Sequence, residues 1–284
     1  MRRFQSDVTP AELRHLPEPE KGVYFQFKDA CSTTQGRIMK QLQENSLLSS
    51  TSLTMHIKYG FDGSGGHSMF NQLNNTKTHS MILTIFCPLK IKDQSGKVIW
   101  EQQTPNAATS QRVLMIQRGT ESTERVKTQS VFNANITEMS NDGLQLQLEK
   151  NSSVNVKVNI VGHMMDRKAS DSYLGITGAY CDLCQYSKDQ CKQHDFVNEG
   201  FEITRNITDM KTIVDTLVKE DGTITRKPKD YAERQGQMHQ PVPDHQNVIS
   251  YQVLHAQMRC FDHFTKVVVH LTASVLDWSE SVHS

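Results

Sequence analysis

Two aspartates stand where predicted β-strands end, and together they could hold divalent metal ions. Asp62 lies in the glycine-rich run Phe61-Asp62-Gly63-Ser64-Gly65-Gly66, and Asp166 follows Val161-Gly162-His163-Met164-Met165. Carboxylates that converge from neighbouring strands can bridge two ions about 3.5 to 4 Å apart, which activates an attacking oxygen and stabilises a leaving one. Such hard oxygen ligands favour Mg²⁺, with Mn²⁺ as its substitute. The alternative is that each aspartate is an ordinary turn residue, because Asp-Gly is a common turn pair.

A cysteine cluster near residue 185 has the spacing of a zinc half-site. Two residues separate Cys181 from Cys184, and the turn between them lets two thiolates bind one tetrahedral Zn²⁺ ion. Cys191 and His194 repeat this spacing and could close a local four-ligand site, although their loop would be cramped. Distant histidines are alternative ligands: His239, His245, His255, His263 and His270. A redox Cys-x2-Cys is a third interpretation, and the cluster lacks the strand–helix context of that chemistry.

Alternating strands are expected to position the two aspartates. Residues 53–59 alternate apolar and polar side chains, which predicts a half-buried strand that stops at Gly60, where glycine becomes too frequent. Residues 154–160 alternate in the same way and lead directly towards Asp166. Between these strands the sequence predicts strands at 81–91, 97–100 and 112–116, a turn at 93–96 and a helix over 120–140.

Helical segments are predicted towards both ends of the chain. Residues 9–13 resemble a helix start with proline in the first turn, and residues 36–47 form a helical run. After about Gly175 the sequence becomes rich in cysteine, charge and helical patterns. Residues 248–276 have the apolar spacing of an ordinary amphipathic helix.

Composition places the chain among globular proteins. Its 284 residues are 36% hydrophobic and 22% charged, so a sizeable core is possible and wholesale disorder is not expected. No stretch reaches the roughly 18 apolar residues of a membrane span, and the N-terminus lacks the apolar core of a signal peptide. We therefore expect an intracellular protein without a membrane partner. A net charge of +0 argues against a free-standing nucleic-acid-binding domain, so any contact with DNA is expected to use a local patch or another domain.

Several weak motifs occur together in one order. They are Phe61-Asp62-Gly63-Ser64-Gly65, Gly96-Lys97-Val98-Ile99-Trp100-Glu101 with Pro105-Asn106, Asp166, Tyr180-Cys181-Asp182-Leu183-Cys184, Phe201-Glu202-Ile203-Thr204-Arg205 and Val248-Ile249-Ser250-Tyr251-Gln252-Val253-Leu254-His255. In this order and near this spacing they resemble the catalytic subunit of the V(D)J recombinase and the Transib transposases. The resemblance runs from about residue 54 to about residue 272.

The resemblance implies an α/β fold, an RNase H-like mixed sheet with helices, as in DDE transposase cores. Asp62 and Asp166 would then be two of three carboxylates that hold two Mg²⁺ ions. The implied reaction is a water attack that nicks one DNA strand, followed by attack of the freed 3′ hydroxyl on the opposite strand, which leaves a hairpin. Cys181 and Cys184 would supply half of a Zn²⁺ site in a helical insertion.

The resemblance also divides the chain. We expect residues 1–52 to be a helical lead-in, 53–175 to be the first part of the RNase H-like catalytic domain, and 176–284 to begin a helical zinc-binding insertion. The third carboxylate and two zinc-binding histidines are expected beyond Ser284, since Glu280 is a poor substitute, so this core is expected to be incomplete and inactive alone. Arg167 stands where the vertebrate recombinase has an acidic neighbour, which favours an invertebrate or transposon-borne relative or a truncated gene model.

The expected partners follow from the same resemblance. They are double-stranded DNA, a second copy in a homodimer and an accessory recombinase subunit, with the nucleus as the place of action. Two further interpretations stay open. One is a non-catalytic, zinc-stabilised remnant that binds DNA or protein, and the other is a thiol–disulfide enzyme that depends on Cys181 and Cys184 alone.

Overall fold

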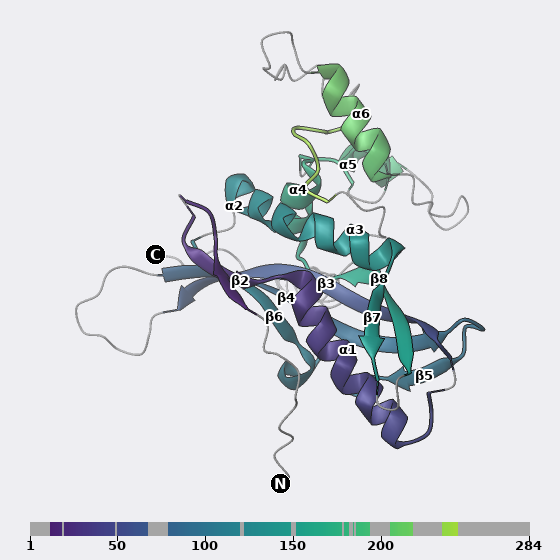
Figure 1. Cartoon of the computed structure of the whole chain (residues 1–284). Helices are drawn as coiled ribbons and strands as arrows, with labels where there is room; N and C mark the ends of the chain where they lie inside the picture. Colours follow the sequence, from purple (N-terminus) through teal and green to yellow (C-terminus); the bar gives the residue numbers. More distant parts are fainter. Residues whose placement is uncertain are drawn as a thin grey trace, which may run out of the picture. The chain divides into compact units, whose positions relative to one another are not determined.

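A mixed β-sheet with helices forms the described part of the chain (Figure 1). The structure, a computed structural model, describes residues 12–18, 20–48, 50–67, 79–119, 122–148, 152–177, 179–181, 184, 186–193, 205–217 and 235–243. Residues 1–250 make up one compact unit and residues 251–284 a second, so every described residue belongs to the first.

The sheet has eight strands in the order β1-β2-β6-β4-β3-β8-β7, with β5 pairing with β4. Their bounds are β1 Leu13–His15, β2 Gly22–Phe25, β3 Ser52–His67, β4 His79–Asp93, β5 Val98–Glu101, β6 Arg112–Arg118, β7 Leu144–Gln147 and β8 Ser153–His163. Strands β3 and β8 are parallel, and the other paired strands are antiparallel. The long central strand β3 therefore lies between an antiparallel neighbour, β4, and a parallel one, β8.

Six α-helices accompany the sheet in the described residues. They are α1 Phe27–Glu44, α2 Thr123–Lys127, α3 Asn133–Asn141, α4 Arg167–Leu174, α5 Lys188–Gln193 and α6 Ile207–Leu217. Short 3₁₀ turns occur at Ala108–Ser110 and Thr128–Phe132. No helix of this described part is long and apolar enough to cross a membrane.

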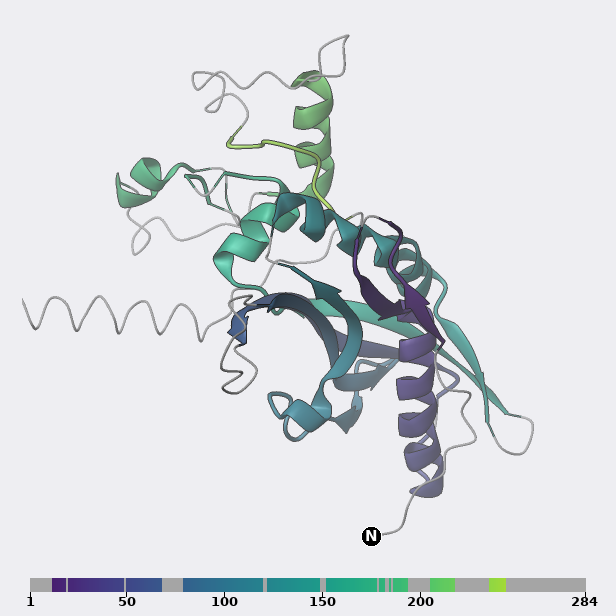
Figure 2. The same ribbon diagram turned by 90° about the vertical axis from the view of Figure 1, so that its left-hand side faces the viewer.

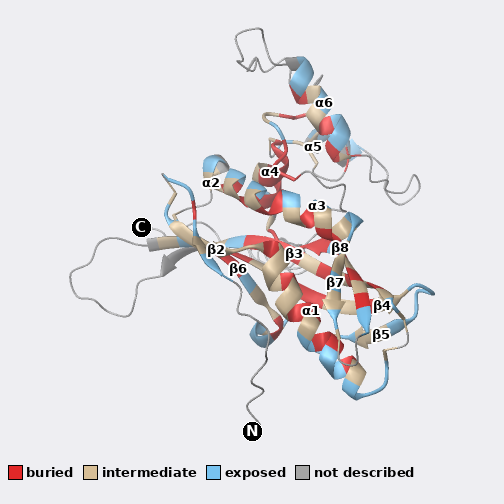
Figure 3. Cartoon of the chain, in the orientation of Figure 1, coloured by how far each residue is buried: buried red, intermediate tan, exposed pale blue. Residues whose placement is uncertain are grey.

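The core lies between one face of the sheet and helices α1 and α3. Odd-numbered residues of β3 point into it and are buried: Leu53, Met55, Ile57, Tyr59 and Phe61. Aromatic rings from three elements meet there, with the Tyr59 ring centroid 6.3 Å from that of Phe27 and 6.4 Å from that of Phe132. Figure 3 shows the buried residues concentrated where these helices meet the strands. The strict alternation of β3 thus separates a packed face from a second face.

The second face of the sheet carries the even-numbered residues of β3. Thr54, His56 and Lys58 are half-exposed there, and Asp62 is exposed. Helices α1 to α4 all pack on the other side, since their buried residues belong to the clusters that contain Tyr59 and Phe61. Figure 2 shows the strands curving, with α1 and α3 on the convex side. The face that carries Asp62 is therefore concave.

Several sequence predictions hold and others are wrong. The strands near 81–91, 97–100, 112–116 and 154–160 are confirmed, with small changes at their ends. The turn at 93–96 is confirmed too: Asp93 Oδ1 accepts hydrogen bonds from the amides of Ser95 and Lys97, and Gly96 has φ +85°. The expected helix at 36–47 is present but spans Phe27–Glu44.

The prediction that the strand ends at Gly60 is wrong. Strand β3 continues to His67, because β4 pairs with the glycine-rich segment residue by residue, including Asp62 with Leu83 and Gly63 with Ile82. The predicted helix over 120–140 is divided into α2, a 3₁₀ turn and α3.

Residues 13–15 do not form the predicted early helix. They make strand β1, which pairs with β2 and extends the sheet beyond β6, so the lead-in is not purely helical. The division of the chain at residue 175 stays a prediction. The amphipathic segment 248–276 lies outside the described residues.

Candidate active site

The register of β3 and β8 places the two aspartates at equal steps beyond the last paired residues of these strands. The last paired residues of these parallel strands are Tyr59 and His163. Asp62 lies three residues beyond Tyr59, and Asp166 lies three residues beyond His163. Neighbouring parallel strands run in the same direction at the same rise per residue. Asp166 therefore follows the end of β8, while Asp62 lies on the part of β3 that continues beyond that point beside β4.

Gly60 fixes the point where the chain leaves β8. The amide of Met164 donates a hydrogen bond to the carbonyl oxygen of Tyr59 at 2.8 Å. A Cβ atom added to Gly60 would lie 2.6 Å from the backbone nitrogen of Met164 and closer still to its carbonyl group. Such contacts are too short for real Cβ atoms, so glycine permits the approach that places Asp166 beside β3.

A small apolar cluster contains the residues that precede the two aspartates in sequence. Phe61 precedes Asp62 and is 1% exposed, while Met165 precedes Asp166 and is 6% exposed. Both belong to one buried cluster with Tyr173 of α4, whose ring centroid lies 5.6 Å from that of Phe61. Each acidic side chain is thus next in sequence to a buried one. Locked neighbours of this kind hold functional groups in place.

Asp166 also caps helix α4. Its Oδ1 accepts a hydrogen bond from the amide of Ala169 at 2.7 Å, and its backbone is extended, with φ −72° and ψ 170°. This is the N-cap geometry in which a short acidic side chain satisfies an unpaired helical amide. An ionised carboxylate has further acceptor sites beyond that one bond. Asp166 is half-exposed, so the remaining sites face an accessible region.

This donor set fits a hard divalent cation. Asp62 is exposed and Asp166 is half-exposed, and each lies three residues beyond the last pair of β3 and β8. Mg²⁺ binds through one or two carboxylates together with water and substrate phosphates. Among the described residues, however, no group of three or more His, Cys, Asp or Glu side chains could hold a metal ion. The assignment of Asp62 and Asp166 as metal ligands stays a prediction.

The Cys-x2-Cys segment forms a tight, hydrogen-bonded turn. Tyr180 and Ser187 make an isolated β-bridge, and the Cys181 amide donates to the Tyr186 carbonyl oxygen at 2.9 Å. Within the turn, the Cys184 amide lies 3.4 Å from the Cys181 sulfur and donates to it. The turn thus holds the two cysteines of the motif close together through their backbones.

Arg205 hydrogen-bonds to the backbone of this turn. Its Nε donates to the carbonyl oxygens of Cys181, at 2.6 Å, and of Cys184, at 2.8 Å. Its Nη2 donates to the carbonyl oxygen of Gln235, so three segments meet at one arginine, which is only 8% exposed as a whole residue. Sequence reasoning named Arg205 within a family landmark but gave it no role.

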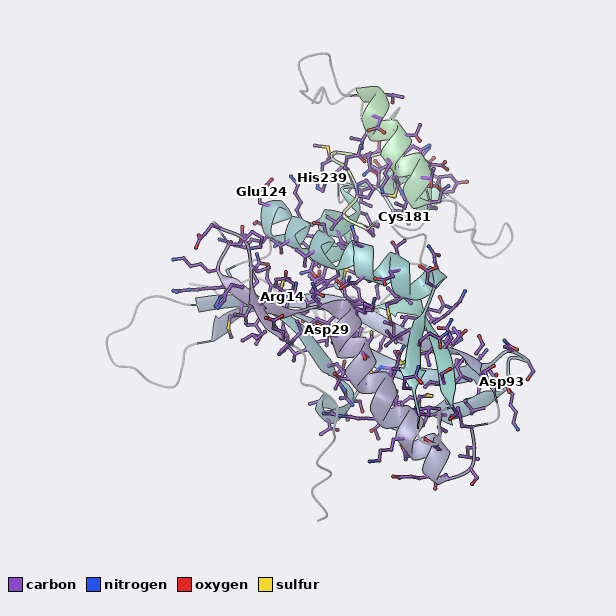
Figure 4. All side chains as sticks on the ribbon, in the orientation of Figure 1. Arg14, Asp29, Asp93, Glu124, Cys181 and His239 are labelled. Carbon is purple, nitrogen blue, oxygen red and sulfur yellow. The ribbon has the colours of Figure 1, made fainter. Side chains whose placement is uncertain are left out.

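Most of the other predicted zinc ligands lie outside the described part of the chain. Cys191 falls in α5, and His194 lies outside the described residues, as do His245, His255, His263 and His270. His239 is described and lies near Gly175, with Nδ1 2.9 Å from the Gln240 carbonyl oxygen. Figure 4 labels Cys181 and His239. No described histidine completes a metal group with the two cysteines, so the predicted zinc site and zinc-binding insertion are not shown here.

The comparisons with known proteins agree with this arrangement of strands. Residues 54–179 match the family model of the RNase H domain of recombination-activation protein 1 (RAG1). Among curated proteins, none matches the chain closely enough to count as a relative. The matched segment begins in β3 and ends after α4, so it contains both aspartates and the parallel pair β3–β8. The chain therefore carries a RAG1-like RNase H core, of the kind found in this family of DNA recombinases and Transib transposases.

Proposed function

We propose that this chain provides the nuclease centre of a DNA recombinase or transposase, with Asp62 and Asp166 as ligands for Mg²⁺ or Mn²⁺. The observation that carries the proposal is the register of β3 and β8, which places each aspartate three residues beyond the last paired residues. The match of residues 54–179 to the RAG1 RNase H domain supports it.

The two aspartates contribute in different ways. Asp62 extends from the concave face of a long, doubly paired strand and is open to a large ligand. Asp166 is held by the Ala169 amide, so its carboxylate does not need to be ordered when a ligand binds. Divalent ions bound there would supply water activation and charge neutralisation at a phosphate. The reaction expected from the resemblance is a nick followed by strand transfer to a hairpin.

The wider assembly belongs to the same proposal. Double-stranded DNA is the substrate, and a homodimer with an accessory subunit, acting in the nucleus, is the expected setting. A third carboxylate comes from outside the described residues. The Cys181–Cys184 turn holds Zn²⁺ together with ligands that also lie outside them, at the start of the proposed insertion after residue 175.

A nicking assay on supercoiled plasmid tests the nuclease. The chain would be incubated with Mn²⁺, whose looser coordination tolerates an incomplete site, alongside Asp62→Asn and Asp166→Asn variants. With Mg²⁺ the incomplete site is expected to be inactive, and with Mn²⁺ we expect slow nicking by the parent chain that both variants lose. Equal nicking by parent and Asp62→Asn would show that Asp62 is no ligand and that the activity has another source.

A second candidate function is a zinc-stabilised binding module without catalysis. The organisation of the cysteine turn favours it, because the Cys184 amide bond to the Cys181 sulfur and the buried Arg205 hold the backbone of both cysteines in place. Zinc content and thermal unfolding with and without a chelator test this function. One zinc ion per chain, a chelator-sensitive fold and no Mn²⁺-supported nicking would give this candidate first place.

A further inference from the structure

Four lysines gather on the concave face of the sheet. Lys58 lies on β3, Lys90 and Lys92 lie on β4, and Lys157 lies on β8. The register places them in adjacent rows: Thr54 of β3 is opposite both Lys92 and Lys157, and His56 is opposite Lys90. All four lysines are half-exposed. We call this set, with His56 at its centre, the lysine face.

The lysine face lacks close ion pairs within the described part of the chain. None of its four lysines is in an ion pair with a described acidic residue. Lys58 donates to the neutral amide oxygen of Asn106 at 2.7 Å. Glu101 is opposite Lys90 in the register of β4 and β5. Burial lowers the pKa of His56, and so do the charges of the neighbouring Lys92 and Lys90.

Amide side chains alternate with the lysines on the same face. Asn159 is opposite His56, and its Nδ2 lies 3.5 Å from His56 Nδ1. Asn155 and Gln145 are opposite each other on β8 and β7. Lysine, asparagine and glutamine side chains are among the groups that bind DNA phosphates without reading bases. The face thus has both the charge and the donor types of a backbone-binding surface.

The lysine face and Asp62 lie along one strand. Thr54, His56, Lys58, Gly60 and Asp62 alternate to the same side of β3. At a rise of about 3.3 Å per residue, Thr54 and Asp62 are about 26 Å apart along the strand. That length matches about eight base pairs of duplex DNA at roughly 3.4 Å each. The concave curvature of this face also suits a cylindrical ligand (Figure 2).

We propose that the lysine face is a phosphate-binding track that holds the flank of a DNA duplex and directs it along β3 to Asp62. The inference rests on the proposed function and adds the surface by which the chain holds its substrate. A chain of zero net charge has no general surplus with which to attract DNA, so binding needs such a local concentration of cations. The contact is independent of base sequence, because only phosphates are engaged.

Salt dependence of binding tests the track quantitatively. Each neutralised phosphate contributes about −0.9 to the slope of log K against log salt concentration. A Lys90→Gln/Lys92→Gln double variant should therefore have a slope smaller in magnitude by about 1.8. At about 0.1 M salt its affinity should fall on the order of 10- to 100-fold. The probe is a fluorescent 30-base-pair duplex, titrated with the full chain at 50 to 200 mM NaCl without added Mg²⁺ or Mn²⁺, so that no strand is cut.

A matched control removes the same charge from the other side of the sheet. Arg37 and Lys40 are both exposed on α1, and the variant Arg37→Gln/Lys40→Gln should bind with the parent slope and affinity. Equal losses in the two double variants, or a parent-like slope for Lys90→Gln/Lys92→Gln, would overturn the track. Binding of single-stranded RNA through these lysines without binding of duplex DNA would overturn its assignment to DNA. Thermal unfolding of each variant establishes that the fold is intact.

Different results would refute the DNA-binding track and the nuclease. The Asp62→Ala variant should lose nicking and keep the DNA affinity and salt slope of the parent. A parent chain that binds through the lysine face but never nicks would refute the nuclease alone. Nicking that is insensitive to Lys90→Gln/Lys92→Gln, with unchanged DNA affinity, would refute the track alone.

Discussion

Replacing Gly60 by alanine should separate the ends of β3 and β8. The new Cβ would meet the backbone nitrogen and carbonyl group of Met164, and backbone atoms cannot rotate away as a side-chain end can. Overpacking of this kind costs about 1 to 3 kcal/mol. The displaced amide would also lose its hydrogen bond to Tyr59, which is worth about 1 kcal/mol. We expect the free energy of unfolding to fall by about 2 to 4 kcal/mol.

Urea unfolding followed by circular dichroism measures this change. With a denaturant slope of about 2 kcal/mol per molar, the midpoint of Gly60→Ala should fall by about 1 to 2 M. Gly96→Ala is the control, because Gly96 has φ +85° and no atom within 4 Å of an added Cβ, so its cost of about 1 kcal/mol is conformational alone. Mn²⁺-supported nicking should drop about 100-fold in Gly60→Ala, since a misplacement of roughly 1 Å has that effect. If Gly60→Ala were no less stable than Gly96→Ala, the approach of Met164 would not be what aligns the two strands.

Three further predictions concern the remaining parts of the site. Asp166→Ala should lower the free energy of unfolding by about 1 kcal/mol, because the amide of Ala169 loses its hydrogen-bond acceptor. Asp166→Asn should keep the stability of the parent and lose only nicking. The melting temperatures of the two variants distinguish these effects. Arg205→Lys should lower zinc affinity about 10- to 100-fold in a chelator competition, because lysine cannot bridge the carbonyls behind both cysteines, and unchanged affinity would exclude this supporting role. Burial lowers the pKa values of His56 and His239, so the unfolded chain binds more protons than the folded chain as pH falls through about 6.5, and stability should decrease between pH 7.5 and 5.5. Urea unfolding at the two pH values measures this decrease, which should be smaller in a His56→Gln/His239→Gln double variant.

The local patterns of the sequence were sufficient to predict five of the eight strands, β3, β4, β5, β6 and β8, and to single out both aspartates as candidates. The alternation of residues 53–59 and 154–160 identified the strands that become β3 and β8. It did not predict that these strands are parallel neighbours, because pairing is decided by contacts distant in sequence. Nor did it predict their register, which shifts at a bulge between Ile57 and Lys58. Since a shift of one residue moves every side chain to the other face, the alignment of Asp62 with Asp166 had to come from the structure.

The glycine-rich segment that begins at Gly60 led to a wrong prediction of where the strand ends. A run rich in glycine has a low intrinsic preference for strand, so Gly60 was interpreted as a stop. In the structure Gly60 is a strand residue whose missing side chain makes room for Met164. The lysine face was missed for a related reason. Its four lysines come from three strands, and no window of sequence brings them together.

The capping bond of Asp166 bears on how relatives of this chain would change over time. A lineage that abandoned DNA cleavage would still need an aspartate, or a residue of similar capping ability, to start α4, because the Ala169 amide requires an acceptor. Asp62 stands exposed within strand β3, and its proposed role is metal binding rather than the start of a helix. Retention of Asp166 in a relative is therefore weak evidence that the relative still cleaves DNA. Retention of Asp62 would be stronger evidence of selection for cleavage than retention of Asp166.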